Sequence, residues 1–285
     1  MNTDNDVLDR NADRIVKEIG IPPCPAILTK LLRETRADEP DFRRVGRLVG
    51  GDVALASAVL KVTNSSFYGL RTKAASVQQA LTLLGLNTAT QLVTGLLLRQ
   101  AFSGAAAPGM ERYWKTSMAT SLISALLCGE TARGDGGVAC TYGLFRDCGM
   151  PVMLQKFPIY ADIFDGSALT PGEPVLEIEN ERYMINHARV GAQLARSWHL
   201  PESLCFAILH HHDVLYSDEV LAHAEAGAVA LIAIGLAAEQ LYCSAIGAAH
   251  HEWALAGEWA LFELGLTQER FAGISRRVNA SINHL

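Results

Sequence analysis

Histidine and acidic residues that could bind a metal ion gather in the second half of the chain. All nine histidines follow residue 186, and the candidates are His187 and the triplet His210, His211 and His212. Asp147, which follows Arg146, could add a carboxylate from an earlier segment. Imidazole and carboxylate groups are typical ligands of hydrolytic metal sites, where the ion lowers the pKa of bound water and polarises a phosphoryl oxygen. These residue types therefore predict metal chemistry, provided that the fold brings them together.

Helices must position these residues, because the hydrophobic period is helical almost throughout the chain. Pro201 fits a corner between two helices, since proline is common at the first position of a helix. That corner would fold the helix of His187 back against the helix of His211, with Asp147 brought in from an earlier helix. The helices expected here span about 141–156, 182–199 and 202–212.

The predicted fold class is all-α. No alternating apolar run bounded by turn pairs marks a strand. Apolar residues at the i, i+3, i+4, i+7 spacing follow Ser76, which fits an N-cap, and Asn87 could cap the next helix. Further helices are expected at about 110–130, 221–243, 252–264 and from about 267.

Two lobes are expected. The loop at 103–109 (SGAAAPG) is rich in glycine, alanine and proline and is a plausible boundary. It separates a helical N-terminal lobe at 1–103 from a helical bundle at 110–285, within which 165–174 (DGSALTPGEP) is a turn-rich loop.

Composition excludes several classes of protein. Hydrophobic residues make up 49% and charged residues 19%, so the chain can bury a large core. A net charge of −6 and the absence of a basic run argue against nucleic-acid binding. The apolar stretch Ala226–Ala238 is flanked by Glu225 and Glu239 and is too short for a membrane span. The acidic N-terminus and six cysteines without a CxxC pair favour a cytoplasmic protein with reduced thiols.

The N-terminal half contains four characteristic motifs, which are Ile21–Pro25, Gly51–Leu55, Leu60–Gly69 and Val77–Gly85. In these motifs the chain resembles the HDOD branch of the HD superfamily of metal-dependent phosphohydrolases, and Asn64, Ser65 and Gly85 match structural positions of the family signature. The resemblance covers about residues 20–240 and implies an HD-like helical bundle packed on an N-terminal helical lobe, in an output or scaffold module of bacterial signalling.

Compared with active members of the superfamily, the ligand set is incomplete. The resemblance places Thr116 at the first histidine position, Arg146 at the histidine of the His-Asp pair, and only apolar residues and glycine at 230–237, where a late aspartate belongs. Arginine stays protonated and cannot be a ligand. Its fixed charge within ~5 Å of a divalent ion costs several kcal/mol even at an effective dielectric constant of ~20. At most Asp147, His187, His211 and His212 remain as ligands.

Three interpretations of these residues stay open. The histidine triplet could be a solvated helix end, because protonated histidine is favourable near a helix C-terminus and adjacent side chains point about 100° apart. The remaining ligands could instead hold one weakly bound divalent metal. Arg146 could pair with Asp147 or a neighbouring carboxylate, or bind an anion.

The expected function is a non-catalytic regulatory module of bacterial signal transduction. It would act through contacts with signalling proteins, without a nucleic-acid or membrane partner, and would need no cofactor apart from that single ion. One alternative is a metal-dependent phosphohydrolase with an incomplete ligand set. Another is a sensor that binds a phosphorylated ligand or nucleotide near Arg146. The sequence names neither the partner nor the oligomeric state.

Overall fold

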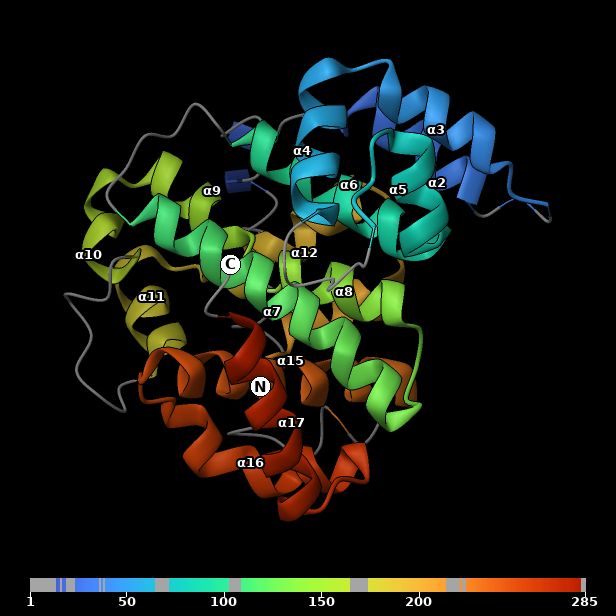
Figure 1. The fold of residues 1–285 in the computed structure, drawn as a ribbon. Coiled ribbons are helices and arrows are strands. Elements are labelled where there is room, and N and C mark those ends of the chain that lie inside the picture. Colours follow the sequence, from blue (N-terminus) through green and yellow to red (C-terminus); the bar gives the residue numbers. More distant parts are fainter. Residues whose placement is uncertain are drawn as a thin grey trace.

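The computed structural model is helical, and no strand occurs in the part of the chain that it describes (Figure 1). The all-α prediction is therefore confirmed. The described residues are 14–15, 17–18, 24–35, 37, 39–64, 72–102, 109–164, 174–213, 221 and 224–282. Ser65, the loop at 103–108 and the turn-rich segment at 165–173 lie outside them.

The first lobe is a group of short helices with side-chain caps. Asp41, Asp52 and Ser76 each accept a hydrogen bond from a backbone N–H in the first turn of a helix, as N-cap residues do. Asn87 is not a cap, because α6 already begins at Leu86. The helices are α2 (Ala26–Thr35), α3 (Phe42–Gly50), α4 (Val53–Thr63), α5 (Val77–Leu84) and α6 (Leu86–Ala101).

Two residues of the family signature have a visible structural role in this lobe. The side chain of Asn64 donates to the carbonyl of Ala74 at 2.9 Å and accepts from its N–H at 2.7 Å. These two bonds tie the end of α4 to the start of the segment that leads into α5. Gly85 joins α5 to α6 with a φ of 77°, a conformation that favours glycine because it has no Cβ.

The second lobe holds the longer helices. The boundaries of two of these helices differ from the sequence prediction. The expected helix at 141–156 is two helices that break around Arg146–Cys148, and the expected helix at 182–199 is likewise two. The helices are α7 (Met110–Thr131), α8 (Gly136–Phe145), α9 (Gly149–Lys156), η2 (Pro158–Tyr160), α10 (Ala161–Phe164), α11 (Val175–Tyr183), α12 (His187–Ser197), α13 (Glu202–Leu209), α15 (Ala226–Ile246), α16 (His251–Leu264) and α17 (Gln268–Ile282).

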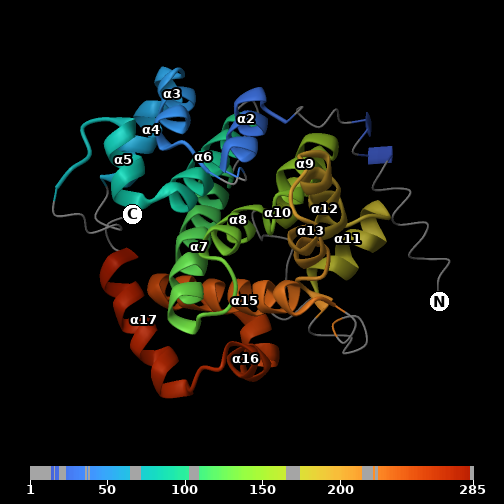
Figure 2. The same ribbon diagram turned by 90° about the vertical axis from the view of Figure 1, so that its right-hand side faces the viewer.

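The central helix of this lobe is α15. Figure 2 shows it running below α7 and α8, with α16 and α17 beneath it. Its 21 residues are long and apolar enough to cross a membrane by length and composition, but 56% of its most apolar window is buried in the fold. The apolar stretch Ala226–Ala238 therefore forms the first part of a longer core helix, which also contains Glu239 and ends at Ile246.

The lobes contact each other through α6 and α8 (Figure 2). Gly95 on α6 faces Leu144 on α8 so closely that a Cβ at Gly95 would lie 2.5 Å from the leucine Cδ2. The buried apolar residues of both lobes form one continuous core. The boundary at 103–109 stays a prediction.

Candidate metal centre

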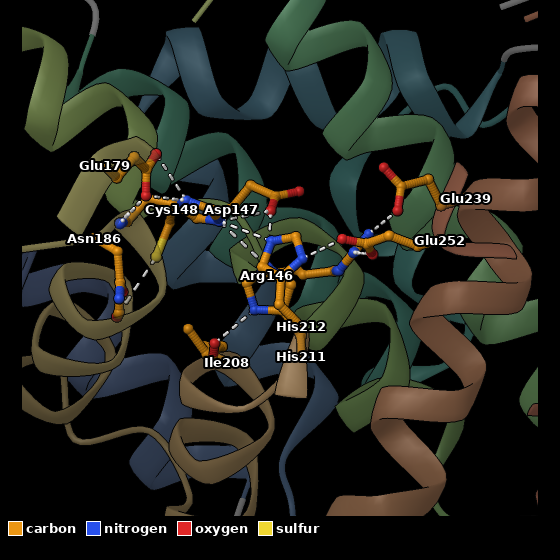
Figure 3. Close-up of polar contacts among 12 residues, drawn as sticks. Arg146, Asp147, Cys148, Glu179, Asn186, Ile208, His211, His212, Glu239 and Glu252 are labelled. Atoms are coloured by element: carbon orange, nitrogen blue, oxygen red, sulfur yellow. Dashed lines mark hydrogen bonds and ion pairs between the residues drawn. The ribbon is translucent and has the colours of Figure 1, made fainter. Parts of the chain in front are cut away.

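The four residues selected from the sequence meet at one place in the second lobe. Asp147 lies in the turn between α8 and α9, His187 is the first residue of α12, and His211 and His212 follow the end of α13. Each offers one ligand atom, and these atoms all lie within 4.8 Å of one another. Figure 3 shows Asp147, His211 and His212 between Glu179 on one side and Glu239 and Glu252 on the other.

Two glycines bring Asp147 to His187. A Cβ on Gly149, the first residue of α9, would lie 1.9 Å from the carbonyl oxygen of His187 and 2.7 Å from the backbone nitrogen of Gly191. Such distances leave room for no side chain, so α9 packs directly on the backbone of α12. Asp147, two residues before Gly149, is thereby held beside His187.

The histidine triplet reaches the site because α13 ends early. The helix stops at Leu209, not near residue 212 as the sequence predicted, and the triplet lies in the turn that follows. In that turn His210 points to Asp213, with 2.6 Å between Nδ1 and Oδ2. His211 and His212 both direct Nε2 toward His187. The 100° spacing of a helix therefore does not apply to these side chains.

The ligand atoms are spaced as in a metal shell. His187 Nε2 lies 3.4 Å from His211 Nε2 and 3.3 Å from His212 Nε2. Asp147 Oδ1 lies 3.2 Å from His211 Nε2 and 3.6 Å from His187 Nε2. Zinc bonds of about 2.0–2.1 Å in tetrahedral geometry separate neighbouring ligand atoms by about 3.3–3.4 Å.

Each imidazole is held from behind by an acceptor on its other ring nitrogen. His187 Nδ1 lies 2.8 Å from Glu179 Oε2, and His211 Nδ1 lies 2.7 Å from the carbonyl oxygen of Ile208. His212 Nδ1 contacts Glu252 Oε1. Metal-binding histidines have such partners almost always, because the bond at Nδ1 fixes the tautomer that offers Nε2 to the ion.

Glu179 is a fully buried carboxylate that the sequence analysis missed. It also accepts from the backbone N–H of His187 at 2.9 Å and from the hydroxyl of Tyr160. Its sequence neighbourhood is an ordinary charged helix (EIENER), so no local signal marks it. Only the fold brings α11 across the start of α12.

Arg146 turns away from these ligands toward a second acidic group. Its guanidinium pairs with Glu239 on α15 and lies 3.5 Å from Glu252 on α16. His250 Nε2 is 3.2 Å from the same Glu239 oxygen. Pairing of Arg146 with a neighbouring carboxylate was expected from the sequence, but Glu239, Glu252 and His250 were not expected as its surroundings. Glu239 stands two residues beyond the segment searched for a late acidic ligand, so a slightly wider search would have found it.

The charges of the site act strongly on each other. Burial works against ionisation of Asp147, but Arg146 and the hydrogen bonds from His187 and His211 together outweigh it and hold the pKa of that carboxyl well below its usual range. Burial also disfavours a charged His187, yet Glu179 and Asp147 raise its pKa to about 10. Burial and His212 lower the pKa of His211 to about 4.

The residues fit one divalent metal ion. Three nitrogen lone pairs and a carboxylate converge at close range, an arrangement that needs a cation or a shared proton. Nitrogen and oxygen donors of this kind suit zinc, manganese, iron or nickel. The metal assignment of Asp147, His187, His211 and His212 stays a prediction with this geometric support. The anion-binding role of Arg146 also stays a prediction, and the two carboxylates on its guanidinium weigh against it.

The sequence profile of the HDOD domain matches residues 21–214, which is more than half of the chain. The chain belongs to the HDOD family. Structural comparison agrees with this assignment. An HDOD domain protein of unknown function from Geobacter sulfurreducens is 18% identical, with a TM-score of 0.78 and 98% of each chain covered. This similarity confirms the fold that the resemblance implied.

Two further solved structures share the HDOD fold. A candidate signal transduction protein from Marinobacter aquaeolei VT8 is 24% identical, with a TM-score of 0.74, covering 98% of this chain and 64% of that one. A candidate phosphohydrolase from Shewanella amazonensis SB2B is 17% identical, with a TM-score of 0.71, covering 95% and 96%. At these identities the comparison establishes the fold.

Among curated sequences, an uncharacterized protein of Treponema pallidum (strain Nichols) is 25% identical over 215 residues. The match covers 73% of this HDOD chain but only 40% of the relative. This chain therefore corresponds to less than half the length of that protein.

Proposed function

We propose that this HDOD protein is a regulatory module of signal transduction that binds one divalent metal ion and acts through contacts with a partner protein. The observation that carries the proposal is that four distances among the ligand atoms of these four residues, 3.2–3.6 Å, match the spacing of ligands around a tetrahedral ion. Structural zinc sites are closed by four protein ligands, whereas catalytic sites keep an open position for water or substrate. Three histidines and Asp147 would close the shell.

Arg146 supports a role other than hydrolysis. It is 3% exposed, carries a permanent charge, and directly precedes the ligand Asp147. Its guanidinium faces Glu239 and Glu252, so it is not directed at a substrate phosphate. A hydrolase of this superfamily would, by the resemblance, have a metal-binding histidine at this position.

Contact with a partner protein is supported by an exposed apolar face. Leu255 and Phe262 on α16 are 75% and 80% exposed. They lie seven residues apart and so share one side of the helix. The HDOD assignment and the signal-transduction description of the Marinobacter protein point in the same direction.

Hydrolysis of a phosphoester is the second candidate function, and one observation favours it. The side chain of Asp147 is 28% exposed, whereas those of His187 and His211 are fully buried. Solvent therefore reaches the centre from the side of Asp147. An ion that accepted a further ligand there would have a water molecule to activate.

Metal analysis and activity assays separate the two functions. We expect about one equivalent of a divalent metal in purified wild-type protein, little metal in Asp147→Ala, and no phosphate release by either from a panel of phosphoesters and nucleotides. Turnover that returns when the metal is added back to stripped protein, and that Asp147→Ala abolishes, would establish the hydrolase instead.

Partner binding is tested by affinity capture with wild-type and Asp147→Ala protein as baits. The proposal expects both baits to retain the same partner at a temperature where both are folded. Loss of the partner with Asp147→Ala would show that contact depends on the loaded metal site. Capture by neither bait would count against a module that works through protein contacts.

A further inference from the structure

A second group of potential metal ligands lies beside the first. Glu239, His250 and Glu252 each offer a ligand atom, and these atoms lie within 4.8 Å of one another. They come from α15, from the residue before α16, and from the first turn of α16. Glu252 also contacts His212, a ligand of the first site, so the two groups share a connecting side chain.

The guanidinium of Arg146 is the cation that faces both carboxylates of this group. It contacts Glu239 Oε2 and lies 3.5 Å from Glu252 Oε2. Two mostly buried carboxylates at close range repel each other, so the group needs a positive charge. The guanidinium supplies one charge to two carboxylates, which also contact the imidazoles of His250 and His212. A divalent ion would carry the charge of both carboxylates.

The guanidinium satisfies the group incompletely. Arg146 Nε, His250 Nδ1 and Glu252 Oε2 are buried without a hydrogen-bond partner. Buried polar atoms are almost always paired, so each such atom calls for a partner. Glu252 Oε2 meets Arg146 Nη2 only as an ion pair at 3.5 Å, and Arg146 Nε is an unused donor, so the guanidinium leaves this cluster incompletely bonded.

The hydroxyl of Tyr142 is an independent indication that the cluster accepts another group. Tyr142 on α8 is completely buried, and its hydroxyl has no hydrogen-bond partner. Burial, followed by the charges of Asp147, Glu239 and Glu252, raises its pKa, whereas Arg146 lowers it. The ring packs on α15, where a Cβ at Gly235 would lie 3.2 Å from the hydroxyl oxygen. Tyr142 thus leaves an unpaired hydroxyl beside Gly235, one helical turn before Glu239.

We propose that Arg146 occupies a second metal site as a built-in cation, and that Glu239, His250 and Glu252 become ligands of a second divalent ion when this side chain is removed. The inference rests on the proposed metal-binding function of the first site. On this inference the buried Arg146 takes the place of the second ion, and the first site beside it still binds its own ion. The HDOD chain is thereby limited to a single metal.

The test is metal stoichiometry in purified full-length protein dialysed against Mn(II), measured by elemental analysis and by calorimetric titration. We expect one ion per chain in the wild type and two in Arg146→Ala. Arg146→Lys is the matched control, since it keeps a positive charge at the site, and should bind one ion. Arg146→Ala combined with Glu239→Gln should return to one ion.

Each outcome decides between the claims. One ion in both the wild type and Arg146→Ala would overturn this inference while leaving the first site intact. No metal in any variant would instead contradict the proposed metal-binding function. Folding is checked by circular dichroism with and without Mn(II). If Arg146→Ala fails to fold even with excess Mn(II) while Arg146→Lys folds, a divalent ion cannot replace the guanidinium and the inference fails.

Discussion

His210, His211 and His212 are consecutive, but they have different surroundings. His211 and His212 face the metal centre, while His210 pairs with Asp213 on the other side of the turn. The sequence could identify the triplet as a source of ligands. It could not say which members converge, because that depends on where α13 ends.

The neighbouring histidines give a matched pair of variants. His211→Ala should reduce metal content to near the background of stripped protein, because it removes one of four ligands. His210→Ala should keep the wild-type content. Elemental analysis of both proteins, purified in parallel, is the measurement. Equal metal loss in both variants would contradict the assignment of His211.

Glu179 contacts Nδ1 of His187, so its effect on a bound metal ion would pass through that imidazole. Glu179→Gln keeps the shape of the side chain but removes the charge that holds the imidazole, so metal affinity should fall by about 10–100-fold. Competition with a chromophoric chelator measures the change. Glu181→Gln, an exposed residue of the same helix, is the control and should bind metal as the wild type does. An unchanged affinity in Glu179→Gln would remove Glu179 from the centre.

At the scale of elements, the packing of α9 on α12 places Asp147. The sequence predicted a single helix at 141–156, because the apolar spacing stays helical across the short break and so does not reveal it. In the structure the break around Arg146–Cys148 turns Arg146 and Asp147 in different directions, one to α15 and α16 and the other to the histidines. The contact of Gly149 with the backbone of His187 and Gly191 joins residues about 40 positions apart, so only the fold reveals it.

Gly149→Ala should separate these two helices. The added Cβ would meet the backbone of His187 at 1.9 Å, so the helices must move apart, at a cost of about 3 kcal/mol or more. We expect a lower Tm together with weaker metal binding. Gly129→Ala is the control on α7, where an added Cβ meets nothing within 4 Å and should stabilise the helix by about 0.5–1 kcal/mol. A Tm for Gly149→Ala equal to that of the wild type would disprove the close contact.

At the scale of the molecule, the class, the HDOD assignment and the convergence of the four ligands could be anticipated from the sequence. Helical periodicity predicted the class and the N-terminal motifs predicted the family. The resemblance to that family then selected the four ligands from the histidines and acidic residues of the second half. Glu179 and Glu252 could not be predicted, because no motif marks them in their helices, whereas Glu239 lies just beyond the segment where a late acidic ligand was expected. A pairing between helices distant in sequence depends on how those helices pack.

Metal removal should destabilise the whole chain, since the ion would join α9, α12 and the turn after α13. A ligand present at 100 times its Kd stabilises the folded state by about 2.7 kcal/mol. For a chain of this size we expect a chelator to lower the Tm by about 5–10 °C. Scanning calorimetry with and without chelator checks this. Asp147→Ala should show no such shift. A wild-type Tm that is the same with and without chelator would contradict a bound ion.

A continuous chain of polar contacts also constrains how the sequence of the family can evolve. It runs from Glu179 through His187 and His212 to Glu252 and Arg146. Each member touches a neighbour of complementary charge or bonding type, so a change at one position alters what the next position tolerates. Arg146, Glu239 and Glu252 should therefore vary together among descendants of one ancestor. A lineage that exchanged this arginine for histidine would gain a ligand and keep both acids, whereas a lineage that lost the acids would have no reason to retain the arginine.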